Sequence, residues 1–160
     1  MVTITPIHPA FDDWDGLLSL IMSSFASMDG VIDPPSSALR LTPALLKEKA
    51  LEEIVHLAQD DGQMLGCVFC KPEPPDCLYI GKLAVLPQAQ GKGIGRLLVN
   101  AAEMEARRRD LPQLRLETRI ELTANHSTFA SWGFAWSADG AHSGYARTTF
   151  IEMRKPLISG

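Results

Sequence analysis

The chain is 160 residues long, enough for one domain with its own hydrophobic core and too short for two ordinary domains. Its composition, 46% hydrophobic and 21% charged, is typical of a soluble globular protein, and a net charge of −4 argues against nucleic-acid binding. No apolar run approaches the roughly 18 residues of a membrane span, and the N-terminus lacks the pattern of a secretory signal peptide. We therefore expect a single domain over residues 1–160 that binds neither nucleic acid nor membrane, and an odd count of three cysteines favours a reducing cytoplasmic compartment.

The first third of the chain predicts a strand and two helices. Residues 2–7 alternate between apolar and polar side chains, as a strand does. Residues 11–25 place their apolar side chains on one helical face. A loop rich in glycine and proline follows, and residues 42–53 predict a second helix with Thr42 as N-cap and Pro43 at its first position.

An antiparallel meander of three strands is expected next. Residues 53–70 form two apolar runs around Asp61-Gly62, which is a strong hairpin signal. Residues 71–76 predict another turn, and residues 77–86 a nearly all-apolar third strand. Cys67 and Cys70 face opposite sides of a strand, so together with Cys77 they are expected to be small buried side chains and no metal site is predicted.

The second half continues with a helix from about Gly93 to Arg109, a strand over residues 113–120, a third helical segment, and two final strands. The order of elements predicts an α/β fold with a mixed sheet and no internal repeat. The three arginines at positions 107–109 suit the C-terminal end of a helix, where cations are favoured.

The stretch "QGKGIGR", Gln90 to Arg96, stands between an apolar strand and a helix and contains three glycines. A helix N-terminus has unpaired N–H groups and a partial positive charge, and glycines let a ligand approach the backbone closely. Lys92 and Arg96 add charge at the rim. This pattern predicts a binding site for a phosphate or pyrophosphate, although a tight turn without a ligand has the same composition.

Two familiar phosphate loops fit this stretch less well. A P-loop needs serine or threonine after Gly-Lys, whereas Gly93 follows Lys92 here. A dinucleotide fold fits better, with Glu117 as the acidic residue that would hold a ribose, but the third glycine comes one residue early. A dinucleotide-dependent oxidoreductase therefore remains an alternative at this point.

The loop and its surroundings resemble the GNAT superfamily of acyl-CoA-dependent N-acyltransferases. Gln90, Gly93 and Gly95 match its motif A, "NHSTFASWGF" is similar to its motif B, and "TTFIEMRKPL" is similar to its last strand. The resemblance covers nearly the whole chain. It implies a mostly antiparallel sheet of six to seven strands, splayed at its centre, with helices on both faces, and acetyl-CoA as the acyl donor.

The resemblance also implies where acetyl-CoA binds. Backbone N–H groups of Gln90, Gly91, Lys92, Gly93, Ile94, Gly95 and Arg96 would hold the pyrophosphate. The pantetheine arm would pair with the backbone of Leu83, Ala84 and Val85. An N–H of this strand, for which Val85 is the named candidate, would stabilise the oxyanion during direct attack by an amine.

The amine must lose a proton, so a general base is expected. Glu117 is the first candidate, with His56 and His142 as others, although a solvated carboxylate, a half-buried strand histidine and an exposed loop histidine are the respective alternatives. Many family members have a tyrosine that protonates the leaving thiolate at the position of Phe129. Phenylalanine has no proton to give, so Tyr145 becomes the candidate acid, and a water or no dedicated acid is the alternative.

Asn125 resembles the motif B asparagine and is expected to contact the pantetheine, to cap the helix, or to do both. The acceptor pocket is expected between residues 28–41, the end of the 113–120 strand, and residues 137–146. Asp29 and Asp33 in the first segment would favour a cationic amine unless they only form a solvated loop.

The expected acceptor is a small-molecule or protein amine, and a homodimer is an open expectation because dimers are frequent in the family. A catalytically silent acyl-CoA sensor stays open as another class, because the expected tyrosine is missing.

Overall fold

In the computed structural model, which describes residues 1–158, the chain forms a seven-stranded mixed sheet with helices on both faces, as expected. The strands are β1 (Thr3–Pro6), β2 (Ile54–Asp60), β3 (Gln63–Glu73), β4 (Cys77–Val85), β5 (Gln113–Arg119), β6 (Ala135–Gly140) and β7 (Phe150–Pro156). The α-helices are α1 (Trp14–Phe25), α2 (Pro43–Glu52), α3 (Ile94–Arg108) and α4 (Thr123–Ser131). No helix within residues 1–158 combines the length and apolar character needed to cross a bilayer.

Local chemistry explains most of the boundaries. Thr42 caps α2, since its side chain accepts a hydrogen bond from the Leu45 N–H, and Pro43 begins the helix. The first helix begins at Trp14, three residues later than predicted, because the Asp13 side chain accepts from the Gly16 N–H and sets the start there.

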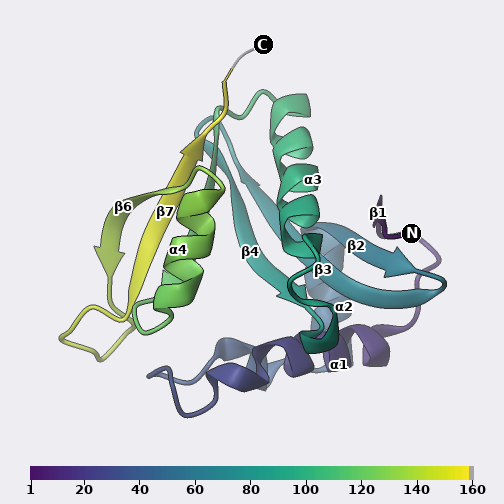
Figure 1. The fold of residues 1–160 in the computed structure, drawn as a ribbon, viewed down its shortest axis with the longest axis horizontal. Helices are drawn as coiled ribbons and strands as arrows, with labels where there is room; N and C mark the ends of the chain where they lie inside the picture. Colours follow the sequence, from purple (N-terminus) through teal and green to yellow (C-terminus); the bar gives the residue numbers. More distant parts are fainter. Residues whose placement is uncertain (159–160) are drawn as a thin grey trace.

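The strand order is β1-β2-β3-β4-β5-β7-β6, and every neighbouring pair except β4 and β5 is antiparallel. The parallel pair matches only Leu78–Ile80 with Leu114–Leu116, after which the two strands separate. Figure 1 shows the result as two arms, β2 to β4 on one side and β6 with β7 on the other, which meet at one end and open at the other. The expected central splay is therefore present.

Two hydrophobic clusters hold the layers together. One lies between the sheet and α3, with α4 packed at its edge, and contains Val68, Leu78, Leu98 and Leu114. The other lies on the opposite face, where α1 and α2 cover β2 to β4, and contains Phe69. Since α1 and α2 do not extend over β5 to β7, the open end of the splay is left for the loops that follow α1 and β6 (Figure 1).

Candidate active site

The glycine-rich loop leads directly into α3, and its glycines have two different roles. Gly91 and Gly93 both have φ near +80°, a conformation that favours glycine, and a Cβ at either would meet nothing within 4 Å. Gly93 is the N-cap of α3 and has no side chain to satisfy the first helical N–H groups. Gly95 lies inside the helix, and its Cβ would lie 3.2 Å from Trp132 of α4, so this glycine serves helix packing.

The other residues of the loop divide in the same way. Lys92 and Arg96 are exposed, so their charges are available to an anion at the helix N-terminus. Ile94 is only 2% exposed and belongs to the core, so only its backbone faces the loop. The Gln90 side chain donates to the Val85 carbonyl at 3.1 Å, which ties the loop to the end of β4.

The backbone of β4 is not equally available at its last three residues. The Leu86 N–H donates to Leu65 on the β3 side, whereas the Val85 N–H points the other way and donates to the Ser24 hydroxyl of α1 at 3.2 Å. Because successive N–H groups alternate along a strand, Ala84 pairs with β3 and Leu83 faces the splay. Of the predicted trio, Leu83 therefore has free backbone groups at the gap, Val85 is engaged by Ser24, and Ala84 is used in the sheet.

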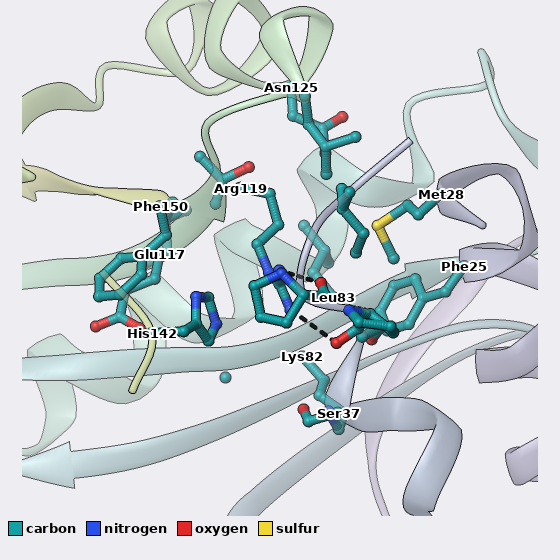
Figure 2. Close-up of a pocket in the computed structure, with 18 of the residues that line it drawn as sticks. Phe25, Met28, Ser37, Lys82, Leu83, Glu117, Arg119, Asn125, His142 and Phe150 are labelled. Atoms are coloured by element: carbon teal, nitrogen blue, oxygen red, sulfur yellow. Dashed lines mark hydrogen bonds between the residues drawn. The ribbon is translucent and has the colours of Figure 1, made fainter. Parts of the chain in front are cut away.

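A cavity of about 750 Å³ occupies the open end of the splay. The three segments predicted to surround an acceptor pocket all line it, together with β4 and α4 (Figure 2). The lining residues of β4 and β5 include Lys82, Leu83, Glu117 and Arg119. The volume is that of a small-molecule site.

The two loops at the cavity mouth are joined by hydrogen bonds between residues far apart in the sequence. We call this contact the clasp: the Tyr145 hydroxyl donates to Asp33 at 2.7 Å, and Arg147 donates to the same carboxylate at 3.0 Å. Arg119 at the end of β5 donates to the carbonyls of Pro34 and Pro35. The hydrogen bond between them lowers the pKa of Asp33 and raises the pKa of Tyr145.

The clasp changes the interpretation of the acidic loop. Asp33 is bound by Tyr145 and Arg147, and neither Asp29 nor Asp33 lines the cavity. The expectation that these two carboxylates attract a cationic amine into the pocket is therefore wrong.

Glu117 and His142, two of the candidate bases, line the same cavity (Figure 2). Glu117 accepts a hydrogen bond from Arg115 at 3.0 Å. His142 is half-buried, and its backbone N–H donates to the Thr149 hydroxyl at 2.8 Å. Burial and, secondarily, the Arg119 charge lower the pKa of His142. Its imidazole is therefore neutral near pH 7 and able to accept a proton.

His56, the third candidate base, lies elsewhere. It is buried on β2, with Nε2 3.8 Å from a Glu105 carboxylate oxygen on α3. It does not line the cavity. The structure therefore places it in the core beside α3, away from the other two candidates.

The two motif B residues lie on α4 at the cavity wall. The helix begins at Thr123 with Leu122 as N-cap, so Asn125 is its third residue and the predicted N-cap role is wrong. Asn125 still lines the cavity (Figure 2). Phe129 does so too and packs edge-on against Trp132, with ring centroids 5.7 Å apart, so its ring fills space where a hydroxyl was sought.

The cysteines are buried, and they belong to separate clusters in the case of Cys67 and Cys70. Burial raises the pKa of both thiols to about 12, so neither is a thiolate near neutral pH. Within residues 1–158, no group of three or more histidine, cysteine, aspartate or glutamate side chains is arranged to hold a metal ion.

Comparisons with known proteins agree with this geometry. Residues 14–134 match the acetyltransferase (GNAT) family. N-alpha-acetyltransferase 30 of Saccharomyces cerevisiae is 34% identical over 74 residues, a match that spans 44% of this chain and 42% of that protein.

Solved structures share the fold at low sequence identity. The PaiA N-acetyltransferase of Thermoplasma acidophilum in complex with coenzyme A has a TM-score of 0.80 at 16% identity, covering 98% of this chain and 99% of the other. A GNAT acetyltransferase of Elizabethkingia anophelis with acetyl-CoA bound has a TM-score of 0.69 at 18% identity, covering 98% of each chain. The family match extends over most of the residues that build the splay, the glycine loop and α4, and with it the chain belongs to the GNAT acetyltransferase family and is an acyl-CoA N-acyltransferase.

Proposed function

We propose that this enzyme transfers an acetyl group from acetyl-CoA directly to a primary amine. The observation that carries the proposal is the continuity between the open N-terminus of α3, the Gly91 and Gly93 loop, and the Leu83 backbone at the gap. The cradle fits a pyrophosphate because no side chain would meet a Cβ at either glycine. The related structures that carry CoA or acetyl-CoA support the same donor.

Leu83 takes the oxyanion role that sequence alone assigned to Val85. Its N–H faces the splay, whereas the Val85 N–H already donates to Ser24. A fixed backbone donor aimed at the carbonyl oxygen stabilises negative charge as it develops, with no reorganisation during the reaction. The carbonyl of Leu83 faces the same gap and is available to the amide groups of the pantetheine arm.

The reaction needs one base and no nucleophilic side chain. His142 or Glu117 removes a proton from the attacking nitrogen, the new C–N bond forms, and the C–S bond breaks to release the CoA thiolate. Phe129 cannot protonate that thiolate, and the Tyr145 hydroxyl is bound to Asp33 with a raised pKa. Water at the cavity mouth therefore supplies the proton, and Tyr145 acts in the clasp.

The loop is tested by two matched glycine variants. Gly93→Ala and Gly62→Ala both place a Cβ at φ near +80° in open space, so each should cost about 1 kcal/mol of stability. Gly62 lies in the β2–β3 turn, away from the proposed site. For the wild type, CoA or acetyl-CoA at 100 times its Kd should stabilise the fold by about 2.7 kcal/mol, a rise in Tm of a few degrees.

Gly62→Ala should keep this rise, and Gly93→Ala should lose most of it. Thiol release from acetyl-CoA in the presence of an amine panel then measures the transfer itself. A rise in Tm with NADH and none with CoA species would reject the proposal, and CoA binding without thiol release on any amine would favour the silent sensor.

A further inference from the structure

The charged side chains that line the cavity are mostly cationic. Among the described lining residues, Arg40, Lys82 and Arg119 are cations and Glu117 is the one carboxylate. Glu117 is already bound by Arg115, a residue outside the cavity lining. The cavity therefore holds an excess of positive charge with no free carboxylate to balance it.

None of these three cations has a carboxylate partner within residues 1–158. Arg119 donates to the backbone carbonyls of Pro34 and Pro35. Lys82 is half-buried, and the nearby Glu53 carboxylate is already paired with Lys49. Desolvation, with repulsion from Lys49, lowers the pKa of Lys82, as expected for a cation without an adjacent anion.

The donor does not account for these charges. The loop proposed to hold the pyrophosphate has its own cations, Lys92 and Arg96, and residues 90–96 do not line the cavity. Lys82 and Arg40 instead face the space left for the acceptor, below the α1–α2 loop. In Figure 2 the Lys82 side chain points toward Ser37, on a different side of the cavity from Glu117 and His142.

We propose that the acceptor is an amine that also carries an anionic group, a carboxylate or a phosphate, which Lys82 binds with support from Arg40 and the Ser37 hydroxyl. This inference rests on the proposed function. The anion would complete the hydrogen bonds of Lys82 and position the nitrogen toward Glu117 and His142. The same positive field disfavours the ammonium form of the acceptor, so it raises the fraction of neutral amine that can attack.

The test compares matched acceptors and matched lysine variants. The acceptor panel contains amino acids and their amides, aminoalkylphosphonates, spermidine, and short peptides that begin with aspartate or asparagine. Lys82→Met removes the charge and keeps the length of the side chain, and Lys82→Arg restores a cation. Lys71→Met is the control, because Lys71 lies on the adjacent strand β3, is exposed and does not line the cavity.

We expect turnover to concentrate on anionic acceptors. Lys82→Met should raise their KM about tenfold or more, Lys82→Arg should recover part of it, and Lys71→Met should match the wild type. Preference for free amino acids or for aspartate-led peptides identifies the source of the anion. Preference for spermidine or amides, an equal effect of Lys82→Met on all acceptors, or no turnover of any member would overturn the inference. The rise in Tm with CoA, measured on every variant, separates these results from a failure of the proposed function.

Discussion

At the scale of single residues, the surroundings of Glu117 and His142 favour different roles. Arg115 binds the Glu117 carboxylate and also binds Glu73 and Glu152, so Glu117 belongs to a charge network on the surface of the sheet. His142 has no carboxylate partner within the described residues and has a lowered pKa. A neutral imidazole at the cavity wall is the better general base near pH 7.

His142→Gln and Glu117→Gln test this assignment. If His142 is the base, its replacement should lower kcat about 10²- to 10⁴-fold, and Glu117→Gln should change kcat less than about tenfold. Because a base works only when deprotonated, the wild-type rate should fall on the acid side with a pKa below the ordinary 6.5 of histidine, and this limb should disappear in His142→Gln. The reverse pattern in the two variants would assign the base to Glu117.

At the scale of elements, the site exists because two strands part and two loops meet. β4 and β5 pair over only three residues each, and beyond Ile80 and Leu116 the gap between them becomes the cavity. The α1–α2 loop and the β6–β7 loop then close one side through the clasp of Asp33, Tyr145 and Arg147. The acceptor side of the cavity is thus shaped by segments more than 100 residues apart.

Tyr145→Phe and Asp33→Ala distinguish a clasp from a general acid. A clasp residue positions the acceptor loops, so either variant should raise the KM of the acceptor by a similar factor, with CoA affinity and kcat nearly unchanged. The double variant should be no worse than either single variant, because both remove the same contact. Steady-state kinetics of the three variants provide the check. A 10²-fold loss of kcat in Tyr145→Phe alone would instead show that Tyr145 donates a proton.

At the scale of the whole molecule, one buried histidine links stability to pH. His56 is 6% exposed, and Glu105, 4% exposed, lies beside it and binds Arg108 and Arg109. Burial lowers the pKa of His56 from 6.5, although the Glu105 charge opposes the shift. Below pH 6.5 the unfolded chain therefore binds more protons at this position than the folded chain.

The free energy of unfolding should consequently fall as the pH drops below 6.5, with no contribution from His56 above that pH. Denaturant unfolding between pH 5 and 8 measures this dependence. His56→Gln should flatten it, whereas His8→Gln, at an exposed position, should leave it as in the wild type. A steeper loss of stability in His56→Gln would mean that Glu105 stabilises the charged imidazole in the folded protein.

The sequence by itself determined the order of the elements, the glycine loop at a helix N-terminus, the hairpin at Asp61-Gly62 and the family, because each depends on periodicity, turn chemistry or a short local motif. Only the tertiary structure decided which backbone N–H of β4 is free, since the Val85 donor is engaged by Ser24, 61 residues away. It also showed that Asp33 is bound to Tyr145 and that the cavity is cationic. Those properties arise from contacts between segments distant in the chain, and no local pattern of residues encodes which side chain another will meet.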